Sequence, residues 1–429
     1  MKHLIHQRLV RHPFAAPSLL AVAIAAVAPL SASAEGFVED TKVNVTARNF
    51  YIGREFRDDA VDRTKAEEWT QSFILNIQSG YTPGPVGFGV DVLAGLAVKL
   101  DGGGGTWGTA LLPRHDDGRP ADDYGRFGVA AKAKFSNTEL KVGEMMPVLP
   151  ILRSDDGRSL PQTFEGGMIT SKEIEGLMLT AGQFRQNSPR DDASMQDMSF
   201  DTDGPGGQPA GTSDRFNYIG GEYGFNDNRT TVGLWTAELK DVYEQQYVQL
   251  LHTQPLGDDL ALTANLGYFQ GDEEGSALAG NLDNKTYSGL FGLKAGGNTF
   301  YVGLQKVSGD TWMRVNGTSG GTLANDSFNN SYDNAGEESW QLRHDYNFAA
   351  MGVPGLTLMN RYISGDNIEL AGNDDGKEWG RESELAYTIQ NGPAKNLNLK
   401  WRNSSFRSQA NTRDLDENRI IIQYPLSIL

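Results

Sequence analysis

The stretch Asn396–Phe406, NLNLKWRNSSF, alternates between apolar and polar residues with a period of two. Leu399 and Trp401 fall on one parity, whereas Lys400 and Arg402 fall on the other. This period predicts a β-strand with one apolar face and one cationic face. The chain carries a formal net charge of -17, so two cations aligned on one face of a strand indicate a special environment on that side.

The start of the chain has the pattern of a secretory signal peptide. Lys2, Arg8 and Arg11 precede the apolar run Ser18–Leu30, and Ala32-Ser33-Ala34 fits an A-x-A cleavage site. The run has 13 residues, which is short of the ~20 that a membrane-spanning helix requires. We therefore expect residues 1–34 to be a signal peptide and residues 35–429 to be the mature protein.

Composition limits the classes of function. The signal peptide holds three cations and no acids, so the mature chain is more acidic than the whole. Such a charge argues against nucleic acid or an anionic membrane surface as partner. The chain has no Cys, which excludes disulfides, thiolate metal sites and cysteine nucleophiles. We expect no cofactor, no metal site and no catalytic residues.

Alternating runs with turn residues between them recur along the mature chain, and we count 18 candidate strands. The connections alternate between long and short, with one exception at Lys240-Asp241, where a tight hairpin replaces an expected long loop. In the last third, residues 365–377 are one of the expected long loops. Alternation of this kind is typical of outer-membrane barrels, which have short periplasmic turns and long external loops. A soluble β-sandwich gives no reason for long loops at one end and apolar outer faces.

We therefore predict an all-β fold, an 18-stranded antiparallel transmembrane β-barrel in the outer membrane of a Gram-negative cell, with inward-folded loops. Leu399 and Trp401 then face outer-membrane lipid, and Lys400 and Arg402 face a wet lumen. Turning such a cation toward lipid costs ~2–4 kcal/mol at the midplane. The expected partners are lipid, the barrel-assembly machinery and small solutes.

The same parity test places more cations in the lumen. A closed barrel makes the first and last strands neighbours. The predicted basic ladder on one wall therefore consists of Arg48, Arg361, Lys400, Arg402 and Arg419. A row of lumenal cations selects anions, and the planar fork of Arg suits carboxylates. For any single Arg, pairing with a lumenal acid such as Glu382 or Glu384 is the alternative. For the whole row we expect too few inward acids.

Two loops have residues that favour burial in the lumen. Met146–Gly167 contains prolines and apolar residues together with Arg158, and Leu323–Glu337 is rich in Asn, Ser and Tyr. An ordinary surface loop is the alternative for both. The residues of the two loops that we expect to be brought into the lumen are Arg158, Asp326, Asn329, Tyr332 and Asp333. Asp326 and Asp333 are equally compatible with a role as loop caps.

Five segments together resemble the OprD-type outer-membrane porins of Gram-negative bacteria. They are ARNFYIGREFRDD (47–59), MPVLP with DDGRSLPQTFEGG (146–167), SYDNAGEESWQLRHDY (331–346), LTLMNRYISGDNI (356–368) and YPLSIL (424–429). The resemblance implies an 18-stranded barrel whose third and seventh loops form a narrow constriction. It also implies a ladder of Arg and Lys that guides small carboxylate solutes, either amino acids or aromatic and cyclic carboxylates.

Two alternatives stay open: a non-selective general porin, and an outer-membrane barrel that acts as an enzyme or adhesin. Gly317–Gly321 fits the G-x-S-x-G pattern of hydrolases but lies in a Gly/Ser loop without a strand and helix around it. Asp201–Gly204 supplies acids that favour calcium but lacks the rest of an EF-hand loop. Neither motif changes the prediction of a channel.

Overall fold

A computed structural model describes residues 36–57, 63–201, 209–317, 322–410 and 414–429. The predicted signal peptide lies outside the described residues. Of the Asp201–Gly204 segment and of the Gly317–Gly321 motif, only the first residue of each is described. None of the described residues forms a helix with the length and hydropathy that a membrane span requires.

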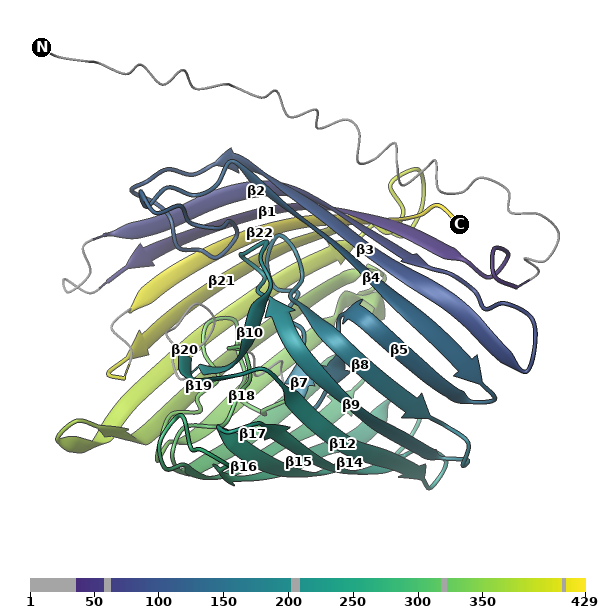
Figure 1. The fold of residues 1–429 in the computed structure, drawn as a ribbon. Coiled ribbons are helices and arrows are strands. Elements are labelled where there is room, and N and C mark those ends of the chain that lie inside the picture. The colour runs from purple at the N-terminus through teal and green to yellow at the C-terminus, as the bar shows by residue number, and fades with distance from the viewer. Residues whose placement is uncertain (1–35, 58–62, 202–208, 318–321, 411–413) are drawn as a thin grey trace, which may run out of the picture.

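The described chain forms a closed antiparallel barrel of 18 strands, as predicted. Antiparallel pairing of the first strand with the last, where Arg48 lies opposite Gln423, closes the wall. Figure 1 shows the strands running at a slant around the wall. Its strands are β1 (Lys42–Phe56), β2 (Lys65–Gln78), β3 (Val86–Asp101), β4 (Asp123–Phe135), β5 (Thr138–Met145), β8 (Thr163–Ser171), β9 (Leu177–Ser188), β12 (Phe216–Phe225), β13 (Thr230–Leu239), β14 (Tyr243–Pro255), β15 (Leu260–Glu273), β16 (Asp283–Ala295), β17 (Asn298–Gly309), β18 (Glu338–Asn347), β19 (Leu356–Leu370), β20 (Asn373–Thr388), β21 (Asn398–Ser408) and β22 (Leu415–Ser427).

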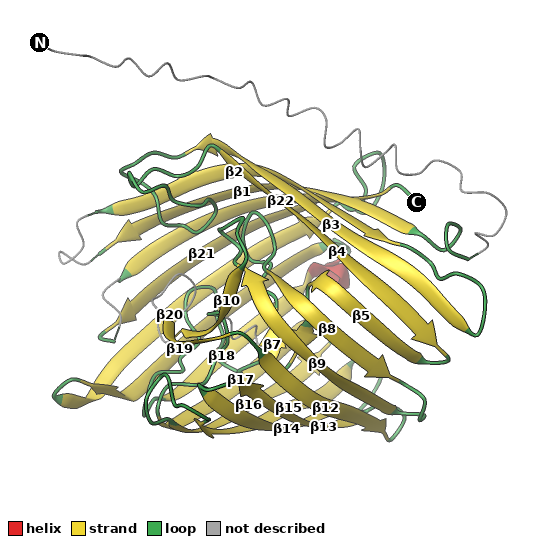
Figure 2. Cartoon of the chain, viewed as in Figure 1, coloured by secondary structure: helices red, strands yellow, loops and turns green. Residues whose placement is uncertain are grey.

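Further elements lie between the wall strands. Two small hairpins belong to loops, and one helical turn, η1, follows β18 and is coloured red in Figure 2. These elements are β6 (Val148–Leu149), β7 (Leu152–Arg153), β10 (Gln196–Asp201), β11 (Pro209–Ser213) and η1 (Phe348–Met351).

The period-two pattern sets the two faces of the wall. On β21, Leu399 and Trp401 are exposed on the outside of the barrel, whereas Arg402 turns inward and is partly buried. Exposed apolar residues on alternate positions of the other wall strands form the lipid-facing surface that this class of barrel requires. The predicted orientation of the opening stretch is confirmed.

The connections also follow the predicted alternation, with one difference. Residues 240–242 form the predicted tight hairpin. Residues 365–377, however, were expected to be a long loop, and this prediction was wrong. β19 continues to Leu370 and β20 begins at Asn373, with register shifts at Ile368. Ile368 is buried inside this hairpin, and its burial favours strand over loop although the segment is rich in Asp, Asn and Gly. Figure 1 shows the hairpin projecting beyond its neighbours at the lower left.

The cores of the protein lie where loops pack against the inner wall. The largest apolar cluster joins loop 3 (residues 146–162), loop 4 (residues 189–215) and loop 7 (residues 310–337) to the wall from β5 to β15. A second joins loop 2 (residues 102–122) and loop 3 to β1, β2, β3 and β22. A third holds loop 7 against β19 and β21. These clusters bury apolar side chains that a solvated external loop would expose.

Candidate functional site

The five predicted ladder residues lie on neighbouring strands of one wall. Arg48 is on β1, Arg361 on β19, Lys400 and Arg402 on β21, and Arg419 on β22. Arg402 lies directly opposite Arg419 in the register of β21 and β22. The closure of β1 on β22 adds Arg48 to the same wall. The structure therefore brings the ladder together.

Each ladder cation has a carboxylate partner, which differs from the expectation of too few inward acids. Arg48 pairs with Asp156 of loop 3 at 2.8 Å, Arg361 with Glu382 at 2.6 Å, and Arg419 with Glu417 at 2.5 Å. The acids come from the neighbouring strand, from the same strand or from the inward loop. The period-two pattern of a single strand does not show which acids of other segments lie next to its cations.

Lys400 and Arg402 share one acid. Glu384 Oε2 lies 2.5 Å from Arg402 Nε and 3.6 Å from Lys400 Nζ. These side chains are also the more open part of the ladder: Arg402 is 22% exposed and Lys400 is 26% exposed, against 4% for Arg48. Two partly exposed cations with one carboxylate leave positive charge facing the lumen.

Loop 3 brings Arg158 beside the ladder, where Arg48 Nη1 donates to the Arg158 carbonyl at 2.6 Å. The Arg158 side chain is buried, and it donates from Nε to the carbonyl of Thr109 at 2.8 Å and from Nη1 to the carbonyl of Gly157 at 2.8 Å. In the described part of the chain no carboxylate lies within ion-pair distance of this guanidinium. Burial, and then repulsion from Arg190 and Arg419, lower the pKa of Arg158 well below its usual value. Arg158, Arg190 and Arg419 thus lie close enough to interact, and they extend the cationic region from the wall to loop 3.

Loop 7 docks on the ladder through Asp326 and Asn329. The Asp326 carbonyl accepts from Arg361 Nη1 at 2.8 Å, and the Asp326 carboxylate accepts from Ser331 at 2.8 Å. Asn329 accepts from Arg419 Nη2 at 3.2 Å and donates to Ser404 at 2.7 Å. Both residues therefore hold the loop against the wall in this structure.

Tyr332 and Asp333 take structural positions instead of facing open lumen. Tyr332 is fully buried and contacts Phe406 edge to face, with ring centroids 6.2 Å apart. Asp333 is buried and pairs with Arg314 of the same loop at 2.5 Å, although burial raises the pKa of the carboxyl. These two residues anchor loop 7, and a solute does not reach them.

Sequence reasoning missed two further inward loops, loop 2 and loop 4. Leu111 and Leu112 of loop 2 are buried against the inner wall, and Thr109 is held by two hydrogen bonds to Glu68 of β2. Thr109 then accepts from Arg158, so loop 2 supports loop 3. Apolar residues within an otherwise polar loop, which pointed to loop 3, were a signal for loop 2 as well. No such signal marked Phe328, whose ring lies against the ladder cations.

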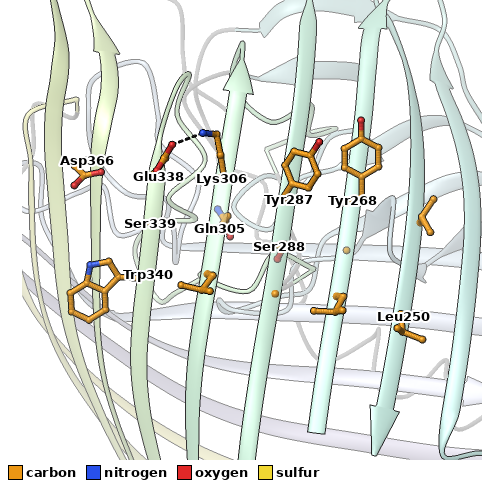
Figure 3. Close-up of a pocket in the computed structure, with 15 residues that line it drawn as sticks. Leu250, Tyr268, Tyr287, Ser288, Gln305, Lys306, Glu338, Ser339, Trp340 and Asp366 are labelled. Atoms are coloured by element: carbon orange, nitrogen blue, oxygen red, sulfur yellow. Dashed lines mark hydrogen bonds and ion pairs between the residues drawn. The ribbon is translucent and has the colours of Figure 1, made fainter.

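A groove lies on the outer wall of β14 to β19, away from the ladder. Figure 3 shows Tyr268, Tyr287 and Trp340 on these strands, with the ion pair of Lys306 and Glu338 beside them. Tyr287 and Trp340 are exposed on the lipid-facing side. The groove is therefore part of the outer surface and not of the lumenal path.

Groups that suggest metal or acid–base chemistry lie apart from the ladder. Among the described residues there is no group of three or more His, Asp or Glu arranged to hold a metal ion. His252 lies 2.9 Å from the Thr230 hydroxyl, and His344 lies 3.0 Å from Asn298. Both contacts sit next to short turns at the end of the barrel opposite the long loops.

A closed 18-strand barrel with an apolar outer surface, inward loops and a cationic inner wall defines an outer-membrane porin. The model of the outer membrane porin, OprD family, matches residues 35–428. The chain therefore belongs to the OprD family of outer-membrane porins, as the sequence motifs indicated.

Relatives and solved structures agree with this assignment. The chain is 61% identical over 415 residues to the porin-like protein GalP of Pseudomonas putida, with 96% of this chain and 98% of that protein covered. It superimposes on a BenF-like porin from Pseudomonas fluorescens Pf-5 with a TM-score of 0.89 and 66% identity, covering 92% of this chain and 100% of the other.

Two further structures contain ligands. Pseudomonas aeruginosa OccK2 (OpdF) in complex with glucuronate has a TM-score of 0.82 and 60% identity, covering 92% of this chain and 98% of the other. Pseudomonas aeruginosa OpdK with vanillate has a TM-score of 0.85 and 48% identity, covering 91% and 100%.

Proposed function

We propose that this porin is a channel for facilitated diffusion of small carboxylate-bearing solutes. The solutes cross the outer membrane through a constriction lined by the Arg and Lys ladder. The single observation that carries the proposal is the pair Lys400 and Arg402, which are partly exposed and share Glu384 as their only ion-pair partner among the described residues. Unneutralised cations at a narrow point of a pore favour anions.

The balance of charge around the ladder supports an anion path. Besides the five ladder residues, Arg54 and Arg158 lie in the same region, which gives seven cations. Among the described residues, the carboxylates in ion-pair contact with them are four: Asp156, Glu382, Glu384 and Glu417. An excess of positive charge in a narrow, partly desolvated lumen acts more strongly on a solute than the same charge in bulk water.

The choice of carboxylates rests on geometry and on the relatives. The guanidinium group presents paired donors that match a carboxylate better than a spherical anion. Glucuronate and vanillate, found with OccK2 and OpdK, have different carbon skeletons but share a carboxylate. We therefore expect the solute of this channel to carry a carboxylate and to be small enough to pass loops 2, 3 and 7.

The proposal also includes how the protein reaches its place. Residues 1–34 direct export as a signal peptide, the barrel-assembly machinery inserts residues 35–429, and outer-membrane lipid covers the apolar wall.

The test is single-channel current of the refolded full chain in a planar bilayer under a salt gradient, with benzoate, glucuronate or arginine added. A small discrete conductance with anion preference, blocked or carried by carboxylates, is the expected result. A large conductance without selectivity contradicts the proposal and indicates a general porin. Absence of conductance from correctly folded protein contradicts the channel itself and favours a barrel enzyme or adhesin.

A further inference from the structure

Phe328 of loop 7 contacts three of the ladder guanidiniums. Its ring centroid lies 4.1 Å from Cζ of Arg402, 5.3 Å from Cζ of Arg361 and 5.8 Å from Cζ of Arg419. An aromatic ring attracts cations to its face through its quadrupole. Phe328 therefore sits at the centre of the cationic cluster and partly offsets the repulsion among its members.

The backbone of Phe328 is held on both sides. Its N–H donates to Glu382 at 2.7 Å, and its carbonyl accepts from Arg419 Nη2 at 2.7 Å. Glu382 uses its other oxygen for Arg361 Nε at 2.6 Å, so the same carboxylate fixes the loop and a ladder residue. The position of the ring is consequently set by the wall of the barrel and not by the loop alone.

Arg402 differs from the other two guanidiniums in what its terminal nitrogens do. Arg361 donates from Nη1 to a loop carbonyl, and Arg419 donates from Nη2 to another. Arg402 uses Nε for Glu384, and within the described ranges its two terminal nitrogens have no hydrogen-bond partner. The Arg402 side chain is 22% exposed on the inner face of the wall, so these nitrogens are accessible from the lumen.

We propose that Phe328 is a specificity-determining residue, which positions Arg402 so that its two terminal nitrogens form a fixed fork for a carboxylate. The ring restrains one face of the guanidinium, and Glu384 restrains its Nε. A fixed fork costs a carboxylate less ordering when it binds with two parallel hydrogen bonds. A chloride ion gains little from such a fork, so the ring raises preference for carboxylate over chloride. This inference rests on the proposed function.

The experiment compares the permeability of glucuronate with that of chloride, from reversal potentials of refolded full-length protein under bi-ionic conditions. Phe328→Leu keeps an apolar side chain but removes the ring, and Phe328→Trp keeps a ring. Leu323→Val is the matched control, because Leu323 is a buried residue of loop 7 in the cluster on the far side from the ladder.

We expect Phe328→Leu to lower the glucuronate-to-chloride ratio by about two- to fivefold, the factor for losing an exposed cation–π contact. Phe328→Trp and Leu323→Val should keep the wild-type ratio. A wild-type ratio in Phe328→Leu, or an equal loss in Phe328→Trp, overturns the inference while the proposed function stands. If wild type shows no carboxylate preference and Arg402→Ala changes nothing, both fail together.

Discussion

Arg402 of β21 and Arg419 of β22 occupy directly opposed positions in neighbouring strands, so two like charges share one place in the register. Like charges directly opposite each other destabilise a sheet. Here Glu384 compensates Arg402, and Glu417 compensates Arg419. The two residues nevertheless differ, because Arg419 is buried whereas Arg402 remains partly exposed to the lumen. Of this pair, Arg402 is the residue that is accessible from the lumen.

Replacing Arg402 by Ala should reduce anion preference. We expect the anion-to-cation permeability ratio to fall by roughly two- to fivefold, which corresponds to the loss of ~0.4–1 kcal/mol for a partly exposed charge. Reversal potentials in a potassium chloride gradient measure this ratio. Arg381→Ala is the matched control, because Arg381 is exposed and bonds Asn403 on the same strand pair. An unchanged reversal potential in Arg402→Ala would reject its role.

Glu382→Gln should destabilise the protein more than Glu384→Gln does. Glu382 is 3% exposed and bonds both Arg361 and the backbone of Phe328, whereas Glu384 is 19% exposed. Breaking a buried ion pair costs about 3–5 kcal/mol, because the partner charge stays buried and unpaired. Urea-induced unfolding of the barrel in detergent gives the comparison. Equal losses of stability in the two variants would contradict this ranking.

The close approach of Tyr332 to Gly380 gives a third prediction. A Cβ at Gly380 would lie 2.3 Å from the Tyr332 hydroxyl but 3.6 Å from its Cζ. Gly380→Ala should therefore displace Tyr332, at a cost of about 1–3 kcal/mol for overpacking, and loosen loop 7. We expect larger and noisier single-channel currents.

Removing the hydroxyl should rescue this variant. The Tyr332 hydroxyl is buried, and no described residue forms a hydrogen bond with it, so Tyr332→Phe alone should leave stability and conductance near wild type. In the Gly380→Ala background it should restore the wild-type current. Failure of the double variant to recover would mean that the hydroxyl contact is not the reason for Gly at position 380.

The sequence predicted the barrel well because the alternation of apolar and polar residues can be recognised within each single strand. Alternation in single strands placed Trp401 outside and Arg402 inside, and the alternating loop lengths placed the two ends of the barrel. The segment around Ile368 was wrong because one buried side chain outweighed a composition typical of loops.

The site was predicted less completely because its contacts join distant parts of the chain. Arg48 and Asp156 are 108 positions apart, and Arg419 and the Phe328 carbonyl are 91 positions apart. Parity along one strand tells which way Arg48 points, but it does not tell which loop arrives to meet it. The carboxylate partners, the ring of Phe328 and the inward course of loop 2 all belong to this second kind of information.

Glu337 provides a prediction on pH. It is fully buried at the end of loop 7, where it accepts hydrogen bonds from the Asn334 backbone at 3.1 Å and side chain at 2.7 Å. Burial, and then the nearby carboxylate of Glu378, raise the pKa of Glu337 well above its usual value. Arg361 and Glu382, which pair with each other, lie in the same region, since they interact electrostatically with Tyr332 as Glu337 does.

A raised pKa in the folded state means that the native protein holds a proton that the unfolded chain releases above its own pKa of ~4.3. Stability from this group is therefore full below that pH and is lost as the pH rises through the folded pKa. Glu337→Gln keeps an acceptor for Asn334 and removes the charge, so it should be as stable as wild type in acid and more stable in alkali. Unfolding temperatures in detergent across a pH series measure the difference. Glu338→Gln, which alters an exposed carboxylate paired with Lys306, should leave the pH profile of wild type unchanged. A profile for Glu337→Gln that runs parallel to wild type would show that Glu337 stays charged in the fold.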